Sequence, residues 1–245
     1  MKLIPLLLLG AGLSNVLAEK KLIEFGWDEP GTAFMREHIA QMEKSPFHGC
    51  VFHVDASKEG GGRGGSFTWE SWGARVFTEA ELKPALEDLK ATKFRRFTDN
   101  FLRFNTTPAK IDWFDDHSAV LTNAFLAARL ARDGKVKGLL FDIEQYEGPL
   151  FDYRKQRDAR TKGWEVYAAQ VRRRGREVME AFQRGYPNPT IFLTFGYSLP
   201  WLESGNGKGS LADCHYGLLA PFLDGMLEAA RGKTRLIDGH EISYG

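Results

Sequence analysis

The chain has 245 residues, and its 33 Lys and Arg against 32 Asp and Glu give a formal net charge of +1. This balance offers no electrostatic basis for binding nucleic acid. The length is sufficient for a single domain with a large buried core. We therefore expect one globular domain that does not bind nucleic acid.

The first 18 residues have the pattern of a secretory signal peptide. Lys2 supplies a positive charge, residues 3–11 are apolar, and residues 16–18 offer small side chains before a cleavage site. The apolar stretch is shorter than the roughly 20 residues of a transmembrane helix, and the sequence has no other candidate. We expect a signal peptide at 1–18, a single domain over 19–245, and a secreted or periplasmic protein without membrane contact after cleavage. The alternative is an uncleaved N-terminal anchor.

Short apolar runs alternate with segments of helical spacing along the mature chain. Thr78 and Glu81 predict a capping box at the start of one helix, although Pro84 favours a later start. Ser118 is the expected N-cap of a second helix, and Gly134 follows its end. A third helix covers the apolar positions from 164 to 182. The expected strands are Leu22–Trp27, Cys50–Val54, Phe94–Phe101, Gly138–Glu144, Ile191–Tyr197 and Leu236–Ile242.

Strands that alternate with helices predict a parallel sheet and an α/β fold. Long polar and aromatic loops follow the strands, as on the functional face of a (β/α)8 TIM-type barrel. Six strands are recognised where such a barrel has eight, so either two were missed or the barrel is C-terminally incomplete, and we favour the second. A doubly wound open sheet is the alternative, but Gly26–Pro30 lacks its glycine-rich phosphate turn.

The predicted fourth strand ends in two carboxylates. Because side chains alternate along a strand, Leu140, Asp142 and Glu144 share one face. Two neighbouring acids repel each other when both are ionised, so one tends to keep its proton. A protonated carboxyl beside an ionised one is what cleavage of a glycosidic bond requires. We predict Glu144 as the general acid and Asp142 as its support; the alternative is that both are ion-paired to lysines or arginines.

The motif Gly138-x-x-x-Asp142-x-Glu144 resembles the Asp-x-Glu end of the strand-four signature of family 18 chitinases. In that family the Glu donates the proton and the preceding Asp helps a substrate N-acetyl group to act as nucleophile. The earlier Asp of the signature is replaced here by Leu140. More broadly, residues 141–146 and 167–197 resemble poorly characterised, exported glycoside-hydrolase-like barrels of bacteria. The resemblance implies a glycosidase that acts on a poly- or oligosaccharide.

Further acids and aromatic side chains follow the predicted strands. Glu241 is our first choice for the second catalytic carboxylate. Indole and phenol rings stack on the apolar faces of sugars, although anchoring of long loops is an equal interpretation of each one, Trp113 included. The residues that we predict to bind substrate are Trp27, Asp28, Asp55, Trp69, Trp72, Asp99, Asn100, Tyr146, Tyr197, Trp201 and His240.

Two other functions stay open at this point. One is a carbohydrate-binding barrel without turnover. The other is a metal-dependent hydrolase, although the sequence lacks a Cys/His cluster and we expect no metal or cofactor; its ligands would be His53, Asp55, Asp142 and His240. Cys50 and Cys214 are expected to be buried thiols rather than a disulfide. The sugar, its linkage and the oligomeric state stay open.

Overall fold

The computed structural model describes residues 20–26, 28–58 and 61–244. The predicted signal peptide and Trp27 lie outside the described residues. No helix in the described part of the chain is long and apolar enough to cross a membrane.

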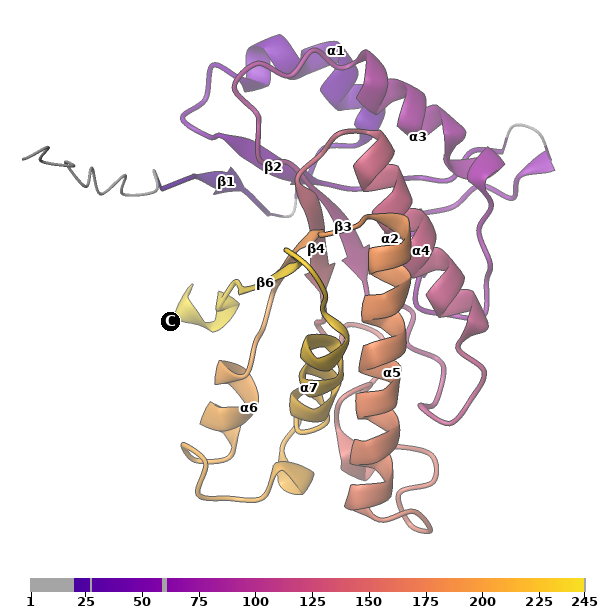
Figure 1. The fold of residues 1–245 in the computed structure, drawn as a ribbon, viewed down its shortest axis with the longest axis vertical. Helices are drawn as coiled ribbons and strands as arrows, with labels where there is room; N and C mark the ends of the chain where they lie inside the picture. Colours follow the sequence, from indigo (N-terminus) through magenta and orange to yellow (C-terminus); the bar gives the residue numbers. More distant parts are fainter. Residues whose placement is uncertain (1–19, 27, 59–60, 245) are drawn as a thin grey trace, which may run out of the picture.

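Six parallel strands form one sheet in the order of the sequence, and the sheet curls into a half-barrel (Figure 1). Each strand pairs with the next one along the chain, so β1 and β6 are the two edges among the described residues. The α/β class and the parallel pairing are thus confirmed, with six strands rather than eight. The strands are β1 (Ile23–Glu24), β2 (Gly49–Phe52), β3 (Phe101–Asn105), β4 (Gly138–Asp142), β5 (Thr190–Leu193) and β6 (Arg235–Asp238).

Helices connect successive strands and cover the outer face of the sheet. The capping box is confirmed: Thr78 accepts from the Glu81 backbone and Glu81 accepts from the Thr78 backbone, while Pro84 lies inside the helix. Ser118 is the first residue of its helix, and His117 is the N-cap. The helices are α1 (Thr32–Met42), α2 (Phe67–Glu70), α3 (Glu79–Ala91), α4 (Ser118–Asp133), α5 (Trp164–Gly185), α6 (Ser198–Glu203) and α7 (Leu219–Ala229), with single 3-10 turns η2 (Tyr153–Lys155), η3 (Leu211–Asp213) and η4 (Glu241–Tyr244).

The main core lies between the sheet and helices α4, α5 and α7. Its centre is aromatic: the rings of Trp72 and Phe141 are stacked with centroids 5.8 Å apart, and Phe222 packs against both. Gly175 allows α5 to approach α7 closely, because a Cβ there would lie 2.0 Å from the Phe222 carbonyl oxygen. The inner face of the sheet carries only a small apolar cluster, of Val51, Phe101 and Leu140 with three partly buried neighbours. Polar side chains, among them Arg103 and Asp142, also lie on this inner face.

The third strand differs most from its prediction. Phe101 begins β3 instead of ending it. Asp99 and Asn100 therefore precede the strand and lie where the strands of the sheet begin, away from the strand ends. Asn100 is buried, where its amide donates to the Phe97 carbonyl oxygen and accepts from the Cys50 backbone. Asp99 forms an ion pair with Lys137 at 3.5 Å. The prediction that Asp99 and Asn100 bind substrate is wrong for this reason.

Candidate functional site

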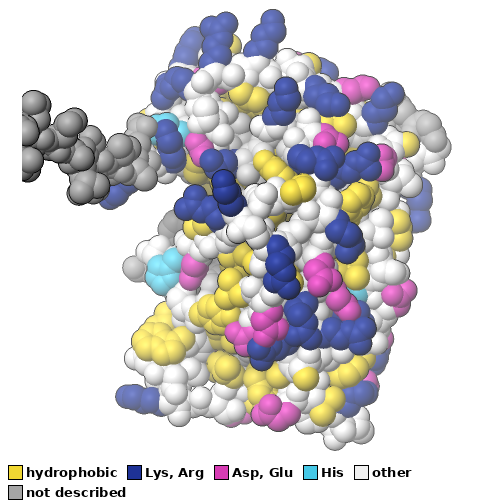
Figure 2. All heavy atoms as spheres, viewed as in Figure 1, with side chains coloured by type: hydrophobic (Ala, Val, Ile, Leu, Met, Phe, Trp, Pro, Cys, Tyr) yellow, Lys and Arg dark blue, Asp and Glu magenta, His cyan; other side chains and the backbone are white. Residues whose placement is uncertain are grey.

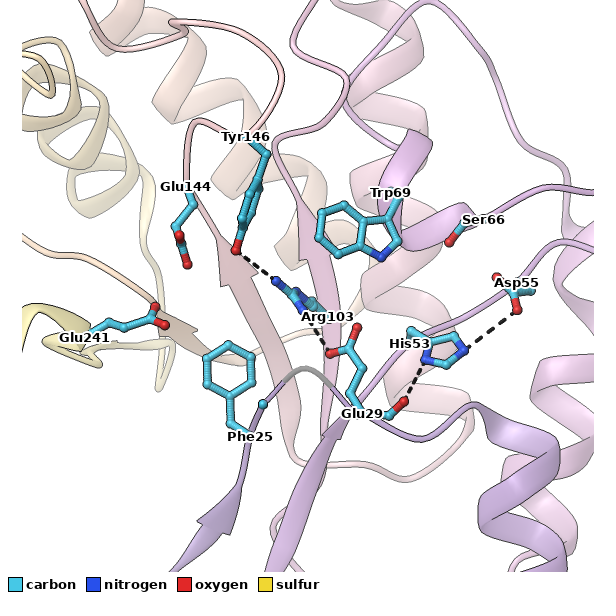
Figure 3. Close-up of a pocket in the computed structure, with 11 residues that line it drawn as sticks. Phe25, Glu29, His53, Asp55, Ser66, Trp69, Arg103, Glu144, Tyr146 and Glu241 are labelled. Carbon is cyan, nitrogen blue, oxygen red and sulfur yellow. Dashed lines mark hydrogen bonds and ion pairs between the residues drawn. The ribbon is translucent and has the colours of Figure 1, made fainter. Parts of the chain in front are cut away.

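A pocket of about 560 Å³ opens where the strands end, on the inner side of the half-barrel (Figure 3). Its walls come from segments that are far apart in sequence: the loops after β1, β2 and β4, strand β3, and the turn after β6. The volume lies within the usual range for small-molecule sites. The lining residues are Phe25, Gly26, Glu29, His53, Asp55, Ser66, Trp69, Arg103, Glu144, Tyr146 and Glu241.

The alternation predicted for β4 is confirmed, and it places Asp142 at the base of the pocket. Phe141 and Ile143 pack in the main core beneath the helices, whereas Asp142 points to the inner side. Asp142 is fully buried and accepts from Arg103 Nε at 3.0 Å and from the Glu144 backbone at 3.1 Å. Burial raises the pKa of Asp142, and the Arg103 charge opposes that rise. The ion-pair alternative therefore holds for Asp142, which anchors its neighbours from below the pocket.

Arg103 is the central cation of the site, and the sequence prediction missed it. Its Nη1 lies 3.2 Å from Glu29 Oε2, and its Nη2 contacts Asp142. The guanidinium also lies over the Trp69 ring, 4.8 Å from the centroid. Its side chain is 7% exposed, so its charge acts in a largely dry environment. An arginine inside the apolar run from Phe101 to Phe104 was the signal that could have identified it.

Tyr146 connects the arginine with the acids. Its hydroxyl accepts from Arg103 Nη2 at 3.2 Å and donates to Asp142 Oδ2 at 3.3 Å. The same hydroxyl reaches the Glu144 carboxylate, and the ring packs edge-on against Trp69 with centroids 5.3 Å apart. These contacts hold Tyr146 and Trp69 as a wall beside Glu144.

Glu144 and Glu241 form a carboxyl pair across the pocket mouth (Figure 3). A left-handed turn at His240, with φ of 48°, follows β6, and the Glu241 backbone then donates to the Thr194 carbonyl oxygen at 3.1 Å. Both carboxyl groups line the pocket, close enough for each to shift the pKa of the other. Burial and the charge of Glu144 raise the pKa of Glu241 to about 7. Burial and the charge of Asp142 raise the pKa of Glu144 as well, so both carboxyls keep their protons to a higher pH than an isolated glutamic acid does.

A second group lies on the far side of Arg103, where His53 and Asp55 follow β2. His53 Nδ1 is 3.0 Å from the Glu29 carbonyl oxygen, which can only accept, so Nδ1 carries the hydrogen. In the neutral ring Nε2 is then a bare acceptor, and it lies 3.7 Å from Asp55 Oδ2. The contact is too long for a hydrogen bond.

Several predicted substrate contacts lie elsewhere. Trp72, which follows α2, is fully buried and stacks on Phe141 in the aromatic core, so its predicted contact with substrate is wrong. Tyr197 donates to Asp224 at 2.7 Å and His240 Nδ1 is 3.1 Å from Ser198 Oγ, both outside the pocket. The other predicted residues outside the lining are Trp113, which is buried, and Asp28 and Trp201, which are exposed.

The alternative metal site is not assembled. Within the described stretches no group of three or more His, Cys, Asp or Glu side chains is arranged to hold a metal ion. Of the four residues in that hypothesis, Asp142 pairs with Arg103 and His240 with Ser198. Cys50 and Cys214 are both free and buried.

The site is acidic although the chain is nearly neutral. Among the described lining residues Arg103 is the one Arg or Lys, and two of the acids are in contact with it. On the face seen in Figure 2, Lys and Arg side chains gather over the upper part of the view, where α1 and α3 lie in Figure 1. The acids in or directly beneath the pocket are Glu29, Asp55, Asp142, Glu144 and Glu241.

Comparison with known proteins gives no significant match to a family model, to a curated protein or to a solved structure. The function of the chain is therefore argued from the geometry of this pocket.

Proposed function

We propose that the chain is a glycoside-hydrolase-like enzyme that cleaves a poly- or oligosaccharide by general acid catalysis. The observation that carries the proposal is the Glu144–Glu241 pair, because both side chains line the pocket and their surroundings raise the pKa of each. Perturbed carboxyls that lie together in a cleft are a common property of catalytic sites. The fold is then part of a (β/α)8 TIM-type barrel, with its chemistry at the strand ends.

We assign the proton in the free protein to Glu241, because burial and the charge of Glu144 raise its pKa to about 7. In the proposed reaction Glu241 protonates the glycosidic oxygen, and the ionised Glu144 attacks the anomeric carbon. This reverses the assignment of Glu144 as the acid from sequence. Water then hydrolyses the glycosyl-enzyme, with Glu241 as the base. Two successive displacements at the anomeric carbon give net retention of its configuration.

The remaining residues position this pair. Asp142 accepts from the Glu144 backbone and fixes its direction, and Arg103 prevents Asp142 from being an unpaired buried charge. Trp69 offers a ring face on which the apolar side of a sugar can stack. We propose a carbohydrate as the partner and a secreted or periplasmic location, the latter from the N-terminal pattern alone.

One observation favours carbohydrate binding without turnover as the second candidate. Glu144 and Glu241 lie next to each other in the pocket lining, and a glycosidic bond has to enter between their carboxyls before either can act. A pair that stays closed would leave a pocket that binds sugar and does not cleave it.

The test is release of reducing ends from a panel of polysaccharides by the wild type and by Glu144→Gln. We expect release by the wild type and a loss of about 10³-fold or more in the variant, since the nucleophile is gone. The matched control is Glu147→Gln, which removes an exposed carboxylate whose partner is Lys110 at 3.8 Å. Proton NMR of the first anomer formed then checks retention. A folded wild type that binds an oligosaccharide without cleaving it would instead establish the second candidate.

A further inference from the structure

The pocket has a second polar side that the proposed chemistry does not use. Glu29, His53 and Asp55 lie across Arg103 from the Glu144–Glu241 pair (Figure 3). Glu29 and Asp55 each present a carboxylate, and His53 Nε2 accepts when the ring hydrogen is on Nδ1. The Ser66 hydroxyl beside them can either donate or accept. Acceptors therefore outnumber donors on this wall, and it fits a group that mainly donates.

Glu29 is the most constrained of the three acceptors. Its side chain is 6% exposed, and Oε2 receives no directed hydrogen bond from the described residues although Arg103 Nη1 is 3.2 Å away. Asp142 shares the same arginine. One guanidinium thus faces two buried carboxylates, and negative charge is left over on this side of the pocket.

We propose that this wall binds the protonated amine of the substrate, so that the sugar cleaved is an amino sugar with a free amino group. An ammonium group has three N–H donors and no acceptor, which complements Glu29, His53 and Asp55. The Trp69 ring beside the wall adds a face that attracts cations. The inference rests on the proposed function only for the statement that the bound amino sugar is also cleaved.

The same contacts define what the wall rejects. An N-acetyl group replaces the charge and two donors by a neutral amide with a carbonyl oxygen that faces other acceptors. A uronic acid brings a carboxylate towards Glu29 and Asp55, which repel it. A neutral hydroxyl can donate only once. Free amine, hydroxyl and N-acetyl at one ring position should therefore be bound in that order of decreasing affinity.

The experiment is calorimetric titration of Glu144→Gln, which holds substrates intact, with tetrasaccharides of glucosamine, glucose and N-acetylglucosamine in the same linkage. We expect the glucosamine tetramer to bind about tenfold more tightly than the glucose tetramer, as one charge-assisted hydrogen bond supplies. Adding Asp55→Asn should remove most of that preference, because it replaces a carboxylate of the wall by a neutral amide. The fold should tolerate the change, since the Asp55 side chain is 67% exposed. The control Asp99→Asn changes a carboxylate where the strands begin, away from the pocket, and should leave the preference unchanged.

The outcomes separate this inference from the proposed function. Equal affinity for the amino and neutral tetramers, or no binding of either, overturns the proposal that the wall of Glu29, His53 and Asp55, the amine wall, binds an amine. A preference for glucosamine that Asp55→Asn leaves intact also overturns it, since the selectivity then arises elsewhere. A preference that depends on Asp55, found with a wild type that cleaves none of the tetramers, supports the amine wall and refutes the glycosidase.

Discussion

Arg103 and Asp142 form a buried ion pair across strands β3 and β4, with Arg103 Nε 3.0 Å from Asp142 Oδ2. Neither side chain is more than 7% exposed. Truncation of the arginine leaves Asp142 and Glu29 as buried charges without a counter-ion. We expect Arg103→Leu to lower the free energy of unfolding by about 3–5 kcal/mol, measured by urea denaturation.

Two further variants check the cause of that loss. Arg103→Leu combined with Asp142→Asn should recover part of the stability, because one unpaired charge is removed with its partner. Arg129→Leu, which breaks the exposed pair with Glu79, should cost less than about 1 kcal/mol. A similar loss in both arginine variants would contradict the role assigned to the buried pair.

Glu241 should make stability and activity depend on pH. Its pKa is raised from 4.5 to about 7, so the folded state holds a proton that the unfolded state has released. The stabilisation is complete below about pH 4.5 and is lost as the pH rises through 7, with a size of about 1 kcal/mol once partial exposure is considered. Glu241→Gln should flatten melting temperature against pH over this range. Hydrolysis by the wild type should decline above about pH 7, where the pair loses its proton.

Truncation of Trp72 should lower stability, whereas truncation of Trp69 should lower the affinity for substrate. Trp72→Ala removes the centre of the aromatic core and should lower stability by about 3–5 kcal/mol. Trp69→Ala removes a pocket wall and should lower oligosaccharide affinity on the order of tenfold. Thermal melting and calorimetric titration of both variants separate the two roles, and a Trp72 effect confined to binding would count against its place in the core.

Tyr146→Phe should weaken the reaction more than the fold. The hydroxyl contacts Arg103, Asp142 and Glu144, so its loss leaves the pair less well positioned. We expect kcat/KM to fall about 10- to 100-fold, chiefly through kcat. Tyr153→Phe is the control, since that hydroxyl donates to two loop carbonyls outside the pocket. Equal effects of the two changes on kcat would refute the positioning role.

The predictable part of the fold is the part governed by local patterns. Alternation along β4 assigned Phe141 to the core and Asp142 to the inner side, and the Thr78–Glu81 capping box fixed the start of α3. Glu241 and Glu144 line one pocket because the strand ends of a parallel sheet gather on one side, and the role of Glu241 as the second catalytic carboxylate stays a prediction.

The missed part depends on tertiary contacts. The phenylalanines from Phe94 to Phe101 suggested a strand, yet the chain enters the sheet only at Phe101. The residues before it form a loop in which the Asn100 side chain donates to the Phe97 carbonyl oxygen. Arg103 was overlooked because its partners are distant in sequence: Glu29 comes from the loop after β1 and Asp142 from β4. Trp72 was predicted to lie in an exposed loop and is buried in the core, because its contacts also come from residues distant in sequence.

The edge position of β6 has a consequence for the order in which the protein loses its properties on heating. Among the described strands, β6 pairs only with β5, over four residues, and most of its side chains are exposed. Edge segments with few buried contacts open at free energies well below that of global unfolding. Glu241 stands on this edge, whereas Glu144 is tied to the buried Asp142. We expect fraying of β6 to separate Glu241 from Glu144 while the core is still folded, so the proposed activity should be lost at a lower temperature than the fold.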